Sequence, residues 1–150
     1  MNDTSYDIRT LNGLIATTLD SAEGYRTAIA DTESHRFADI FRSRAAERDQ
    51  VVQQLRGEVS ALGGTPEESG TLLAGAHRAF LNLKAAITGN DDAAVVSTVE
   101  EGEDHIKAKY EAAMADDGVS APVQAVISTA YQSVRAGHDQ MRDLKHSLVD

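Results

Sequence analysis

The residues best equipped for chemistry in this sequence are carboxylates and one histidine on stretches with helical periodicity. Five of them could face a common interior and supply metal-ligating atoms: Glu23, Glu47, Glu100, Glu103 and His138. Carboxylate oxygens and imidazole nitrogens are the ligands that iron and manganese take inside helical bundles. One hypothesis is therefore an iron or manganese site between helices. The residue types alone favour no particular cofactor.

Glu103 is the most informative of these residues because it lies in an apolar face. At about 100° per residue, Glu103 falls between Val99 and Tyr110 on one side of the predicted helix. A carboxylate in such a face is costly unless a cation, a metal or several hydrogen-bond donors meet it. The rest of the chain must supply that partner.

The competing hypothesis is a buried ion pair. Arg44 and Arg48 point toward the apolar side of the preceding long helix, and a forked arginine–carboxylate contact would satisfy Glu103 without a metal. Two arginines beside several carboxylates disfavour a metal cation at the centre, so the ion pair ranks first. A tyrosine hydroxyl could also donate to a core carboxylate; the candidates are Tyr25, Tyr110 and Tyr131.

The ligand pattern of a complete di-metal site is missing. Such sites use one glutamate from each of two helices and a Glu-x-x-His pair from each of the other two. The sequence contains no Glu-x-x-His; Gln50 stands where histidine would follow Glu47, and Arg135 stands where glutamate would precede His138. We therefore expect no catalytic residues, and ferroxidase or oxidase activity only if a di-metal site forms.

The elements that position these residues are long amphipathic helices. Apolar residues recur at helical spacing, and glycine, proline or capping residues separate the segments. The predicted long helices are 5–30, 34–62, 91–115 and 120–148, with a shorter helix at 70–88. A helix of that shorter length spans about 28 Å, enough to return the chain along a bundle. The prediction is an all-α four-helix bundle in one domain, 1–150, with a crossover helix between the second and third long helices.

Composition limits the function classes. The formal charge of −10 argues against nucleic acid and against anionic membranes. No apolar run approaches the about 20 residues of a membrane span, and the N-terminus lacks the pattern of a signal peptide. The absence of cysteine removes disulfides and thiolate chemistry and is compatible with the cytoplasm, which is the expected location.

Several segments resemble a known family. The matching pieces are Asp20 to Tyr25, Glu47-Arg48, Ala76 to Phe80, Leu83-Lys84, Gly89 to Asp92, Glu100 to Asp104, Tyr110 and Gln132 to His138. On these residues the chain resembles a family of small bacterial ferritin-like four-helix bundles classed as a domain of unknown function. The resemblance implies a ferritin-like fold and a link with stress-response gene sets, but no established activity.

Two functional expectations follow. The first is a non-enzymatic, stress-associated bundle with an arginine–carboxylate core, acting as a homo-oligomer or with a protein partner. The second is a metal-binding protein with a carboxylate and histidine site between its helices.

Overall fold

Four long helices make up most of the described part of the chain. The computed structural model describes residues 4–32, 34–68 and 92–149. The helices are α1 (Thr4–Asp31), α2 (His35–Ala61), α4 (Asp92–Met114) and α5 (Ala121–Val149). Each predicted long helix agrees with the structure to within one residue at both ends. The predicted shorter helix, 70–88, lies outside the described residues.

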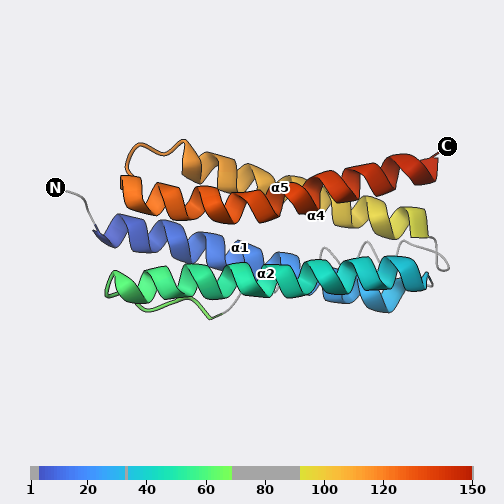
Figure 1. Ribbon diagram of the computed structural model, residues 1–150, viewed down its shortest axis with the longest axis horizontal. Helices are drawn as coiled ribbons and strands as arrows, with labels where there is room; N and C mark the ends of the chain where they lie inside the picture. The colour runs from blue at the N-terminus through green and yellow to red at the C-terminus, as the bar shows by residue number, and fades with distance from the viewer. Residues whose placement is uncertain (1–3, 33, 69–91, 150) are drawn as a thin grey trace.

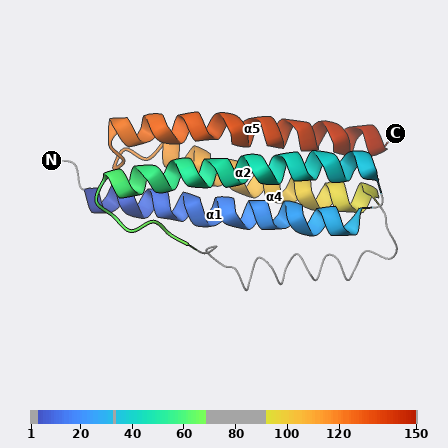
Figure 2. The same cartoon turned by 60° about the horizontal axis from the view of Figure 1, so that its bottom comes forward.

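The helices form a bundle in which α2 and α4 are parallel (Figures 1 and 2). α1 packs against α2 and α4, and α5 packs against the same two helices. α2 and α4 are therefore diagonal neighbours, as are α1 and α5. Because α2 ends at the end of the bundle opposite to the start of α4, the connection between them joins opposite ends. This is the predicted crossover topology.

Local signals set the limits of α2. Ser34 is its N-cap, and its hydroxyl accepts a hydrogen bond from the Phe37 amide at 3.2 Å, which satisfies one of the free donors of the first turn. Gly63 follows the helix with φ of 84°, a conformation that glycine adopts at little cost. These two residues fix where α2 begins and ends.

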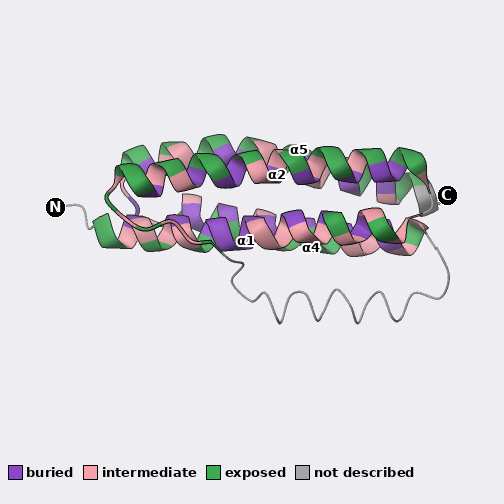
Figure 3. Cartoon of the chain, turned by 90° about the horizontal axis from the view of Figure 1, so that it is seen from below, coloured by how far each residue is buried: buried purple, intermediate pink, exposed green. Residues whose placement is uncertain are grey.

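The apolar core is divided into two clusters. One cluster contains Leu11, Ile15, Leu55, Tyr110 and Ile127 among others. The second contains Phe37, Phe41, Val96 and Met141. Figure 3 shows the buried residues on the facing sides of the helices and the exposed ones outside. The main buried charges, Arg48 and Glu103, belong to neither cluster.

No helix among the described residues is long and apolar enough to cross a membrane.

Candidate functional site

Glu103 and Arg48 form an ion pair across the bundle. Arg48 Nη2 donates to Glu103 Oε2 at 2.7 Å, and the two side chains are 0% and 1% exposed. The pair joins the diagonal helices α2 and α4, so it passes through the centre of the bundle. Of the two arginines that the sequence offered to Glu103, the structure pairs Arg48 with it.

Helix α1 supplies two further contacts to this pair. The Tyr25 hydroxyl donates to Glu103 Oε1 at 2.8 Å, and Arg48 Nη1 donates to Ser21 Oγ at 3.3 Å. Burial, reinforced by the negative charge of Glu103, raises the pKa of Tyr25 well above its usual value. The tyrosine therefore stays a neutral donor. Arg48 Nε is buried and finds no hydrogen-bond partner among the described residues.

Helix α5 contributes its backbone through Gly137. A Cβ at this position would overlap Arg48 Nη2 and lie 3.1 Å from Glu103 Oε2. The absent side chain lets α5 approach the ion pair closely. We call Ser21, Tyr25, Arg48, Glu103 and Gly137 the central polar layer, to which all four described helices contribute.

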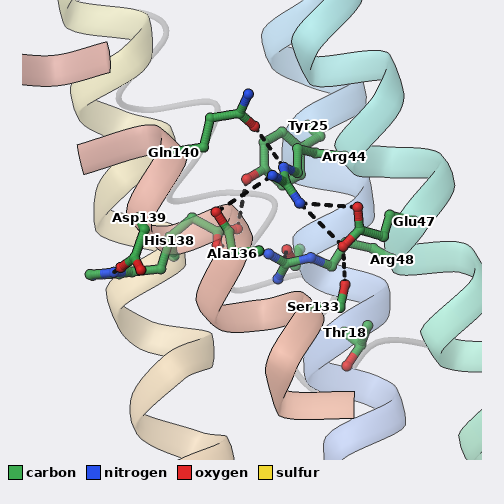
Figure 4. A network of polar contacts seen from close by, with 12 residues as sticks. Thr18, Tyr25, Arg44, Glu47, Arg48, Ser133, Ala136, His138, Asp139 and Gln140 are labelled. Atoms are coloured by element: carbon green, nitrogen blue, oxygen red, sulfur yellow. Dashed lines mark hydrogen bonds and ion pairs between the residues drawn. The ribbon is translucent and has the colours of Figure 1, made fainter. Parts of the chain in front are cut away.

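Arg44 belongs to a neighbouring network between α2 and α5 (Figure 4). Its Nη1 donates to both carboxylate oxygens of Glu47, at 3.1 and 3.0 Å, and its Nε donates to Gln140 Oε1 at 2.7 Å. The Ser133 hydroxyl also donates to Glu47 Oε1. With the Arg44 side chain 15% exposed and that of Glu47 35% exposed, Glu47 is held by an arginine at the edge of the bundle.

The five residues predicted as one metal site are distributed over separate places. Glu23 is 47% exposed and pairs with Arg26 at 3.4 Å. Glu47 and Glu103 each have an arginine partner. Glu100 and His138 do come together, on the seam between α4 and α5.

Asp104 completes this last group. One ligand atom from each of Glu100, Asp104 and His138 lies within 4.8 Å of the other two. Asp104 was not predicted as a ligand because it lies outside the apolar face of the helix. Its spacing of one helical turn from Glu100 was the available signal. Gly137 was also missed, although a glycine inside a helical pattern often indicates close packing.

Comparison with known structures defines the class of protein. The chain is similar to a two-domain protein of Anabaena variabilis ATCC 29413 with DJ-1/ThiJ/PfpI-like and ferritin-like domains, at a TM-score of 0.76 and 11% identity. The match covers 99% of this chain and 38% of that protein. The fold is thus that of a ferritin-like four-helix bundle.

Sequence comparison then gives the family. Residues 7–116 match the family described as Domain of unknown function (DUF2383), and the chain belongs to that family. No curated protein matches the sequence.

Proposed function

We propose that this chain is a non-enzymatic ferritin-like bundle that works by associating with a second copy of itself or with a protein partner. The observation that carries the proposal is the Arg48 guanidinium, fully buried and bonded to Glu103 at the centre of the bundle. The resemblance noted above adds a role in stress physiology to the proposal. A cytoplasmic location is part of the same proposal.

The chemistry of arginine supports this view. A guanidinium has no acceptor atom and stays protonated, so it cannot ligate a metal. At a separation of about 4 Å and an effective dielectric constant of about 20, the Arg48 charge would repel a divalent ion bound to Glu103 by about 8 kcal/mol. This repulsion opposes metal binding at Glu103 while Arg48 stays beside it.

The carboxylates around the centre support it further. Glu47 is held by Arg44 and Ser133, and Glu23 by Arg26. A di-metal centre needs several unpaired carboxylates facing the same space. Here Glu23, Glu47 and Glu103 have arginine partners in three different places.

Iron oxidation provides the first test. Purified full-length protein is mixed with Fe(II), and oxygen and peroxide consumption are followed with electrodes. We expect rates equal to those of Fe(II) in buffer alone. Rapid consumption, together with anomalous density for two bridged metals beside Glu103 and a displaced Arg48, would overturn the proposal.

The mode of action has its own measurement. Light scattering after gel filtration gives the particle mass, to be compared with the chain mass of 16.0 kDa. We expect a mass of at least two chains, or a stoichiometric complex with a defined protein partner. A monomer at all concentrations that forms no such complex would contradict this part of the proposal.

A further inference from the structure

Three side chains with metal-ligating atoms converge on the seam between α4 and α5, apart from the central polar layer. Glu100 and Asp104 are one turn apart on α4, and His138 comes from α5. His138 Nε2 lies 2.7 Å from Asp104 Oδ1. The ring is 12% exposed and Asp104 is 57% exposed. The group is thus reachable from solvent at Asp104, whereas Glu100 and His138 are largely packed.

The orientation of His138 is fixed from its other side. Its Nδ1 lies 3.2 Å from Asp139 Oδ1. Histidines that bind metals usually donate their second ring nitrogen to a carboxylate, which fixes the ring and makes the ligating nitrogen more basic. His138 has this arrangement, with Nδ1 beside Asp139 and Nε2 beside Asp104.

The geometry points to a single divalent transition-metal site made by Glu100, Asp104 and His138. Bonds of about 2.1 Å to a tetrahedral ion place ligand atoms about 3.4 Å apart. The atoms here lie within 4.8 Å of one another, so no pair needs to close by more than about 1.4 Å. Rotation of the two carboxylate side chains provides such a movement, and the fourth position is left to water.

Lys145 is the competitor for this site. Its Nζ lies 3.3 Å from Glu100 Oε2, and its side chain is 38% exposed. The Glu100 side chain is 13% exposed, and a partly exposed ion pair of this kind contributes about 0.2–1 kcal/mol. A metal ion can therefore displace the lysine from Glu100, whereas the fully buried Arg48 has no such exit from Glu103. The seam thus has a cation that a metal can displace, whereas the centre of the bundle does not.

The donor set selects the class of ion. One imidazole and two carboxylates suit zinc, manganese or ferrous iron, and the order of intrinsic affinities places zinc above manganese. Calcium prefers six to eight oxygen ligands and would bind poorly here. The formal charge of −10 adds a diffuse attraction for any cation, so the test must separate specific from diffuse binding.

Calorimetry provides the test. ZnCl₂ is titrated into full-length protein treated with EDTA, at physiological ionic strength. We expect one tight equivalent per chain. His138→Gln should weaken this binding at least tenfold, and Asp104→Asn should weaken it similarly. Lys145→Gln should tighten it about 1.5- to 5-fold, the equivalent of the ion pair it removes.

Matched controls come from the same surface. His105 and Glu101 are exposed on α4 and take no part in the cluster, so His105→Gln and Glu101→Gln should leave the binding unchanged. Circular dichroism melts check that each variant is folded. Because two ligand variants are measured independently, the test still works if one of them does not fold. Absence of the tight equivalent, or equal binding by wild type, His138→Gln and Asp104→Asn, would overturn the proposal.

Discussion

Replacement of Glu103 by leucine should strand a charge in the centre of the bundle. Arg48 is 0% exposed, and its strongest contact is the 2.7 Å bond to Glu103. Without Glu103 it keeps the 3.3 Å bond to Ser21 and the ring of Tyr25, 5.8 Å from its guanidinium carbon. Neither neutralises the charge. We therefore expect Glu103→Leu to destabilise the fold strongly.

The size of the effect follows from a comparison of two variants. Removing one partner of a buried ion pair costs about 3–5 kcal/mol, whereas replacing both partners by apolar residues is often neutral. Tyr25 loses its acceptor in both Glu103→Leu and the double variant Arg48→Met/Glu103→Leu, so that cost cancels. The double variant should be the more stable by about 3–5 kcal/mol, or about 6–20 °C in Tm for a domain of this size.

Thermal and urea unfolding followed by circular dichroism measure this difference. Glu101→Leu is the matched control, because Glu101 is exposed on the same helix and its loss should change the free energy of unfolding by less than about 0.5 kcal/mol. If Glu103→Leu alone fails to fold, the double variant should regain a cooperative transition. Single and double variants within about 1 kcal/mol of each other would refute the reasoning, since that lies well below the cost of a stranded charge.

Two further predictions concern the same core. Gly137→Ala should destabilise the fold by about 1–3 kcal/mol, because its Cβ would overlap Arg48 Nη2. The control is Gly102→Ala, whose Cβ would meet nothing within 4 Å and which should stabilise the fold by up to about 1 kcal/mol. Equal effects of the two variants in urea unfolding would contradict this prediction. Burial raises the pKa of Tyr110 to about 12, above the value of about 10 in the unfolded chain. The unfolded state therefore loses this proton first, and stability should fall between about pH 10 and 12. Tyr110→Phe should reduce that fall, and an unchanged pH profile would argue against it.

The fold was largely predictable because long amphipathic helices have strong periodic signals. The spacing of Val99, Glu103 and Tyr110 placed a carboxylate in the apolar face of α4, and all three are buried in the structure. The capping serine and the following glycine located the ends of α2. The span expected for 70–88, about 28 Å, allowed the chain to cross from one end of the bundle to the other, and α2 and α4 are parallel in the structure.

The partners of the charged residues were less predictable. Helical periodicity turns both Arg44 and Arg48 inward, but it says nothing of how far one helix is shifted along another. A shift of one turn, about 5.4 Å, decides which arginine meets Glu103. The same uncertainty applied to the proposed metal ligands, of which only Glu100 and His138 come together.

The sequence by itself determined that the four long helices form, where they end, and that Glu103 has to be neutralised inside them. These properties depend on neighbours within about one turn along the chain. Only the tertiary structure decided that Arg48 crosses the bundle to Glu103 while Arg44 binds Glu47, and that Asp104 lies beside His138. Those pairings depend on the rotation and axial position of whole helices, which the packing of all four faces fixes together.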